Sequence, residues 1–251
     1  MGNAGWLRSL SAASEPDAHT LICFPHAGGS ALSYGPLART LGPRFRVLGV
    51  QYPGRQDRRR EPLLDNIADL VEGVLPELRE LLPQTAGYSL FGHSMGAVVA
   101  FETCRRLEQD RAMPPSTLFV SGRIAPARKG FQGVHRYSDQ ELIRHLLDFG
   151  GTPTALLEDP EFRSIILAVT RSDYRAIETY TCAPEAAVES PLVALVGDSD
   201  PATSIADLNE WRTHTTGPFT QTSFPGGHFY IDANSHGVAQ LIRDQRESNY
   251  A

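Results

Sequence analysis

The chain has 251 residues, of which 41% are hydrophobic, so it suits one large folded domain and is too apolar for a disordered protein. A formal net charge of −6 argues against nucleic-acid binding, which needs a basic face. No run of about 18 apolar residues and no signal peptide is present, so we expect a cytoplasmic protein without a membrane span. Its three widely spaced cysteines form no disulfide or metal pattern and fit a reducing compartment.

Six short apolar runs alternate with longer amphipathic segments along the chain. Most of the runs are apolar on both faces, as buried parallel strands are. They cover residues 20–24, 46–51, 88–91, 118–121, 192–196 and 219–224. Helices are predicted over residues 32–41, 67–82, 95–108 and 235–243. Strands separated by helices are typical of an α/β fold, with a mostly parallel central sheet flanked by helices.

A stretch in the second half of the chain has no strand and holds helical patterns instead. These lie at about residues 138–148, 155–157 and 160–179, and Gly150-Gly151-Thr152-Pro153 interrupts them. We therefore predict one α/β domain over residues 1–251, with a helical lid inserted at about residues 127–187.

The strongest local signal is the segment Gly92-His93-Ser94-Met95-Gly96, which follows a predicted strand and precedes a predicted helix. In this context the G-x-S-x-G pattern indicates a nucleophile elbow, a tight turn that raises the serine hydroxyl above the sheet. The amino end of the helix favours the negative charge that develops on a reacting carbonyl oxygen. Ser94 is therefore the candidate nucleophile, and a structural serine in a surface turn is the alternative.

A serine hydroxyl needs a base, and the loops after the last two predicted strands supply the candidates. His228 follows the final strand, with glycines beside it, and is the preferred base among eight histidines. The strand before it ends in Gly197-Asp198-Ser199-Asp200, so the acid is Asp200 or Asp198. Asp200 is preferred, because three residues past the glycine give the loop reach toward the imidazole. The order serine, acid, histidine is the one that α/β-hydrolases use.

An oxyanion hole needs two backbone N–H groups, one from the residue after the nucleophile and one from the loop after an early strand. Met95 is the first, and we assign Ala27, in the loop from Phe24 to Ser30, as the second. Gly28 and Gly29 of this loop are alternatively plain turn residues. A phosphate-binding loop is not indicated, because neither GxGxxG nor a Gly-Lys-Ser/Thr ending is present.

Taken together, six segments resemble the type II thioesterases, of the α/β-hydrolase superfamily, that accompany modular polyketide synthases and nonribosomal peptide synthetases. They are FPHAGG at 24–29, QYPGR at 51–55, FGHSMGA at 91–97, SGR at 121–123, GDSDP at 197–201 and GGHF at 226–229. The resemblance runs from about Thr20 to Gln240. Residues 168–173 depart from it, since the family tends to a proline and a Leu-Arg-Ala-Asp run there.

The resemblance implies an enzyme that releases acyl groups from the phosphopantetheine thiol of acyl or peptidyl carrier proteins, and so clears stalled or wrongly primed units. It implies transient contact with those carrier proteins, a monomer, and no metal or organic cofactor. We expect the lid to form an apolar chamber for the acyl group. The expected substrate-binding residues are His26, Phe149, Leu157, Tyr174 and Phe229, and the further lid candidates are Leu146, Leu156, Phe162 and Ile166.

Two other interpretations stay open. A carboxylesterase, or another acyl hydrolase or acyltransferase on the same scaffold, would have the same triad, because a fold does not fix a function. A non-catalytic docking module is the second, and the intact triad of Ser94, Asp200 and His228 argues against it. Arg55 and Arg123 are candidates for contacting the phosphate of the arm or an acidic carrier-protein helix. The initial Met and the lack of an upstream linker favour a free-standing protein.

Overall fold

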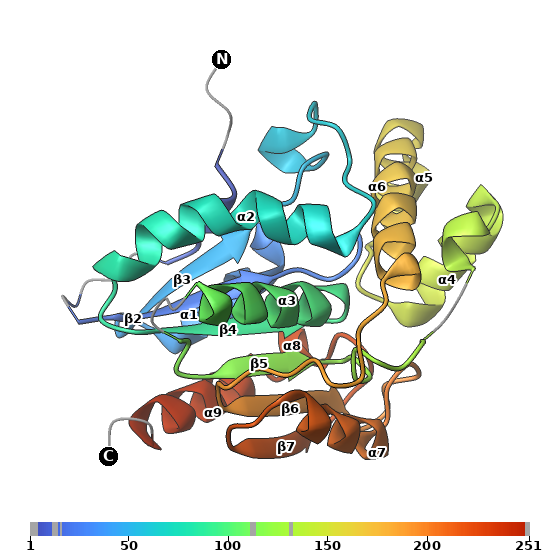
Figure 1. The fold of residues 1–251 in the computed structure, drawn as a ribbon. Helices are drawn as coiled ribbons and strands as arrows, with labels where there is room; N and C mark the ends of the chain where they lie inside the picture. Colours follow the sequence, from blue (N-terminus) through green and yellow to red (C-terminus); the bar gives the residue numbers. More distant parts are fainter. Residues whose placement is uncertain (1–4, 12–14, 16, 111–113, 131–132, 249–251) are drawn as a thin grey trace.

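A seven-stranded sheet forms the centre of the part of the chain that the structure describes (Figure 1). The computed structural model describes residues 5–11, 15, 17–110, 114–130 and 133–248. The strands follow the spatial order β1-β3-β2-β4-β5-β6-β7, and every neighbouring pair is parallel except β1 with β3. Their bounds are β1 Leu7–Ser9, β2 His19–Phe24, β3 Phe45–Val50, β4 Tyr88–His93, β5 Leu118–Ser121, β6 Leu192–Gly197 and β7 Phe219–Phe224. The expected α/β class is confirmed.

The six predicted strands are all present, within one or two residues of their expected bounds. Strands β2, β4, β5 and β6 are buried along their whole length, which explains why their sequences are largely apolar on both faces. Strand β1 was not predicted. It has three residues, pairs antiparallel with β3 at the edge of the sheet and is only partly buried, so no apolar pattern marks it.

Helices cover both faces of the sheet, and the main ones are α1 Gly35–Leu41, α2 Ile67–Leu81, α3 Met95–Gln109, α8 Tyr230–Ala233 and α9 Ser235–Ser248. Alternate side chains of a strand point to opposite faces, which divides the core into two layers. Ile22 and Phe24 of β2 pack in one layer with α2 and α3. Leu21 and Cys23 pack in the other with α1, α8 and α9.

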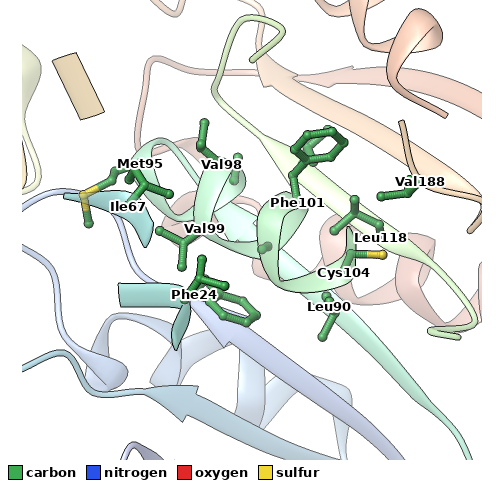
Figure 2. Close-up of a cluster of buried hydrophobic side chains, with 14 of the residues drawn as sticks. Phe24, Ile67, Leu90, Met95, Val98, Val99, Phe101, Cys104, Leu118 and Val188 are labelled. Carbon is green, nitrogen blue, oxygen red and sulfur yellow. The ribbon is translucent and has the colours of Figure 1, made fainter. Parts of the chain in front are cut away.

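Helix α3 lies at the centre of the larger layer (Figure 2). Its residues Val98, Phe101 and Cys104 are fully buried, together with Leu90 of β4 and Leu118 of β5. Each such apolar side chain stabilises the folded state by about 1.5–3 kcal/mol relative to exposure in water. This packing fixes the amino end of α3, and therefore the turn that precedes it, relative to the sheet.

The described residues of the segment predicted to be a lid include three α-helices, which lie beyond one end of the sheet (Figure 1). They are α4 Asp139–Phe149, α5 Thr154–Glu158 and α6 Pro160–Thr179, all within a residue or two of the predicted positions. They share a small apolar core with members such as Leu142, Leu157 and Leu167. Their action as a lid stays a prediction. A further single turn, α7 Ile205–Leu208, follows β6. In the described part of the chain, no helix has the length and apolar character that a membrane span requires.

Candidate active site

The chain turns sharply at Ser94, between β4 and α3. Ser94 has a φ of 56° and a ψ of −119°, and such a positive φ costs a non-glycine residue about 1–3 kcal/mol. Its N–H donates to the carbonyl oxygen of Ser121 at 2.8 Å. A Cβ on Gly92 would lie 2.1 Å from the carbonyl oxygen of Gly96, and a Cβ on Gly96 would lie 2.0 Å from that of Phe24. The close approach of strand and helix therefore requires the two glycines that bracket the serine.

The loops after β6 and β7 bring a carboxylate to an imidazole. His228 Nδ1 lies 2.8 Å from Asp200 Oδ2, and the two side chains are 6% and 0% exposed. Because a carboxylate only accepts hydrogen bonds, His228 Nδ1 is the donor of this bond. The Ser199 N–H donates to the Gly226 carbonyl oxygen at 3.0 Å and ties the two loops together. His228 and Ser94 line the same cavity, so the three predicted residues meet at one edge of the sheet.

Asp198, the alternative acid, belongs to a turn instead. Its Oδ1 accepts hydrogen bonds from the Gly226 N–H at 3.0 Å and from the Ser199 hydroxyl at 2.8 Å, and the residue is exposed. These two bonds, that of Gly226 first, lower the pKa of Asp198. The geometry thus selects Asp200 as the partner of His228, in agreement with the preference drawn from the sequence.

The two predicted oxyanion donors lie next to the nucleophile. Met95 is the first residue of α3, so its N–H has no acceptor within the helix. Ala27 follows β2 and lines the cavity together with Ser94. The next N–H in that loop, of Gly28, is already bonded to Asp173 Oδ2 at 2.7 Å. Because the Gly28 N–H is already engaged, Ala27 rather than Gly28 remains the candidate donor from this loop.

Two further histidines near His228 have lowered pKa values. Burial first, and then the neighbouring His228, lowers the pKa of His26 to about 3, and burial holds the pKa of His93 well below its usual range. The His93 ring centre lies 4.9 Å from that of His228, and its Nδ1 lies 2.9 Å from Ser121 Oγ. That oxygen lies 2.7 Å from the hydroxyl of Tyr230. Both histidines line the cavity together with His228.

A cavity of ≈ 340 Å³ opens between the turn at Ser94 and helices α4 to α6. Four of the expected substrate-binding residues line it, namely His26, Phe149, Tyr174 and Phe229. Leu157 does not, since it is 5% exposed and packs within the apolar core of the three helices. Its neighbour Leu156 lines the cavity instead, because successive residues of a helix point about 100° apart.

Of the remaining lid candidates, two line the cavity and one does not. Leu146 and Ile166 line the cavity. Phe162 is 54% exposed on the surface of α6 and is not part of the lining. The prediction that Phe162 helps to form the acyl chamber is therefore wrong.

Arg55 is committed to a buried ion pair. Its two terminal nitrogens lie 2.8 and 2.9 Å from the two carboxylate oxygens of Asp173, and the side chains are 7% and 0% exposed. The interpretation of Arg55 as a contact for a phosphate or a carrier protein is therefore wrong. Arg123 differs, since its Nε has no hydrogen-bond partner and burial lowers its pKa to about 10. It lines a smaller cavity that Ser94 and His228 also border, and its contact with a partner stays a prediction.

The structure adds two residues that the sequence did not single out. His145 Nε2 lies 2.8 Å from the Tyr174 hydroxyl, and its ring centre lies 4.6 Å from that of Phe149. Thr170 lines the cavity with a buried hydroxyl. The places of His145 and Thr170 at the cavity depend on how helices α4 and α6 pack together, and no local sequence pattern indicates that packing. Over the residues described, no group of three or more His, Cys, Asp or Glu side chains is arranged to hold a metal ion.

Several known proteins are similar to this chain in sequence, and two of those named below also in fold. The family model of the thioesterase domain matches residues 19–246. The thioesterase PikA5 of Streptomyces venezuelae is 41% identical, over 95% of this chain and 84% of its own length. The type II thioesterase BorB from the borrelidin cluster is 41% identical with a TM-score of 0.86, over 97% of this chain and 99% of that one. YbtT, a type II thioesterase from the yersiniabactin NRPS/PKS pathway, is 30% identical with a TM-score of 0.89, over 98% and 100%.

Proposed function

The chain belongs to the thioesterase family, as a type II thioesterase of polyketide and nonribosomal peptide assembly lines, and we propose that it hydrolyses acyl groups from the phosphopantetheine thiol of carrier proteins. In this role it removes stalled or wrongly primed units. The catalytic residues are Ser94, His228 and Asp200, and the oxyanion donors are the N–H groups of Met95 and Ala27.

The observation that carries the proposal is the pairing of His228 with a buried carboxylate beside a strained serine. A serine hydroxyl becomes an effective nucleophile only when a base takes its proton. Asp200 orients the imidazole and stabilises the imidazolium that forms, without itself taking the proton. A docking module needs neither the strained turn nor the buried pair.

Hydrolysis proceeds in two half-reactions. In the first, Ser94 Oγ attacks the thioester carbonyl carbon while His228 Nε2 takes the hydroxyl proton. The carbonyl oxygen becomes negative and is stabilised by the N–H groups of Met95 and Ala27 at the positive end of α3. The carbon–sulfur bond then breaks, the thiol leaves with the proton from His228, and the acyl group remains on Ser94 as an ester.

Water replaces the thiol in the second half-reaction. His228 takes a proton from the water, whose oxygen attacks the acyl carbon, and the same two N–H groups stabilise the oxyanion. The bond to Ser94 Oγ breaks as His228 returns the proton to that oxygen. The products are the carboxylic acid and the free enzyme.

The partner is an acyl or peptidyl carrier protein that docks transiently and presents the thioester on its phosphopantetheine arm. The cavity beside Ser94 accepts the acyl group, and Phe149 and Tyr174 supply apolar walls. Helices α4 to α6 act as a lid over this chamber. The three free cysteines support a reducing, cytoplasmic location.

The test compares hydrolysis of a thioester with hydrolysis of the matching oxygen ester on the same carrier protein. One carrier protein bears a butanoyl group on its phosphopantetheine thiol, and a second bears it on an arm in which oxygen replaces the sulfur. We expect the thioester to be hydrolysed with the higher kcat/KM. An equal or higher value for the oxygen ester would contradict the proposal and favour a carboxylesterase. Each substrate incubated without enzyme gives the spontaneous rate to be subtracted.

A further inference from the structure

A hydroxyl group is buried without a partner in the wall of the main cavity. Thr170, on α6, is 0% exposed, and its Oγ1 has no hydrogen-bond partner. The residue nevertheless lines the cavity that Ser94 and His228 share. Leaving a buried hydroxyl unpaired destabilises a folded protein, so native structures pair nearly all such groups. An oxygen of the bound substrate would supply the missing partner.

The hydroxyl lies against the loop that holds the candidate oxyanion donor Ala27. A Cβ added to Gly28 would lie 2.8 Å from Thr170 Oγ1, so this hydroxyl faces Gly28 directly. One turn further along α6, Asp173 accepts the Gly28 N–H at 2.7 Å and also pairs with Arg55. This turn of the helix is therefore fixed against the loop. The hydroxyl is held beside Gly28, the residue that follows the candidate oxyanion donor Ala27, in the cavity that Ser94 also lines.

Thr170 is the polar member of a mainly apolar stripe on α6. Ile166, Thr170 and Tyr174 are spaced four residues apart, share one face of the helix and all line the cavity. The hydroxyl of Tyr174 is already paired with His145 Nε2 at 2.8 Å. Phe149 of α4 adds a further apolar wall. The apolar walls of this chamber suit a hydrocarbon chain. The unpaired hydroxyl of Thr170 could form a hydrogen bond with an oxygen atom on that chain.

We propose that Thr170 determines acyl specificity by hydrogen bonding to an oxygen on carbon 3 of the acyl group. This inference rests on the proposed thioesterase function. A threonine hydroxyl both donates and accepts, so it pairs with a 3-hydroxyl or a 3-oxo group. Carbon 3 is two bonds from the carbonyl carbon, which matches a side chain that lies beside the oxyanion loop. A plain hydrocarbon chain leaves the hydroxyl unpaired and is bound less well.

The experiment measures kcat/KM for 3-hydroxybutanoyl and butanoyl groups on the same carrier protein. The wild-type enzyme is expected to favour the 3-hydroxybutanoyl group. Thr170→Val, which removes the hydroxyl and keeps a similar shape, is expected to lower the ratio of the two kcat/KM values by about tenfold. Thr170→Ser keeps the hydroxyl, and as the matched control it should keep the preference.

A ratio that Thr170→Val leaves unchanged overturns the inference, including the case in which both substrates lose activity equally. A wild-type ratio near one overturns it as well, and this measurement does not depend on the variant folding. Thermal unfolding gives an independent readout, because loss of an unpaired hydroxyl should not lower the unfolding temperature of Thr170→Val. These results leave the proposed function standing as long as the wild-type enzyme hydrolyses the butanoyl thioester.

Discussion

Replacing Asp173 with asparagine removes one charge from a buried ion pair that joins α6 to the rest of the domain. Asp173 is fully buried and accepts hydrogen bonds from Arg55 on both carboxylate oxygens, at 2.8 and 2.9 Å. It also accepts the Gly28 N–H at 2.7 Å. The amide of an asparagine has one acceptor and one donor, so its NH2 group would face a donor of Arg55 or of Gly28. The guanidinium would keep its charge in a site that is only 7% exposed.

The expected loss of stability is about 3–5 kcal/mol, the usual cost of removing one partner from a buried pair. For a chain of this length, that loss lowers the unfolding temperature by roughly 6–20 °C. A matched control is Glu72→Gln, which neutralises the half-exposed pair of Glu72 with Arg106, where the side chains are 50% and 46% exposed. That change should cost about 0–1 kcal/mol, because solvent screens exposed charges.

Urea unfolding of the wild type, Asp173→Asn and Glu72→Gln measures both free energies under the same conditions. A double variant, Arg55→Met with Asp173→Asn, should lose less than the sum of the two single losses, since it no longer buries a lone charge. The reasoning is refuted if Asp173→Asn destabilises the protein no more than Glu72→Gln does.

Three other predictions test the acid that pairs with His228, the turn at Ser94 and a buried histidine outside the site. Asp200→Asn should lower kcat by about four orders of magnitude, whereas Asp198→Asn should change it only slightly, and steady-state rates at one pH compare them. Gly96→Ala should give no folded protein, because its Cβ would lie 2.0 Å from the carbonyl oxygen of Phe24, and a wild-type circular dichroism spectrum would contradict this. Burial lowers the pKa of His19 to about 4. As the pH falls below 6.5, the unfolded chain therefore protonates at His19 before the folded protein does. The free energy of unfolding should fall by up to about 3 kcal/mol between pH 6.5 and pH 4. Urea unfolding should show a smaller fall for His19→Gln, and an equal fall would rule out His19 as the cause.

The buried strands could be predicted because a strand that is buried on both faces has a continuous run of apolar residues. Strand β2 has six buried residues in a row and was placed within one residue. The edge strand β1 has three partly buried residues and carries no such pattern. Helices α7 and α8 have four residues each, little more than one helical turn, so they are too short for an amphipathic pattern to repeat and reveal them.

The pairing of His228 with Asp200, and the cavity that His228 shares with Ser94, could be predicted because each of the three residues occupies a fixed place after a strand, in a fixed chain order. The lining of the cavity could not, because it depends on contacts between distant segments. The bond from Gly28 to Asp173 spans 145 residues, and nothing near either residue indicates it. Leu156 and Leu157 both fit an apolar helix, and only the packing of α5 decides which of them faces the cavity.

Intact-protein mass spectrometry of an acyl-loaded carrier protein tests most directly whether Ser94 transfers acyl groups to water. After incubation with the wild-type enzyme, the carrier protein should return to the mass of its free-thiol form, and with folded Ser94→Ala it should keep the acyl mass. Loss of the acyl mass at the wild-type rate in the presence of Ser94→Ala would contradict the account.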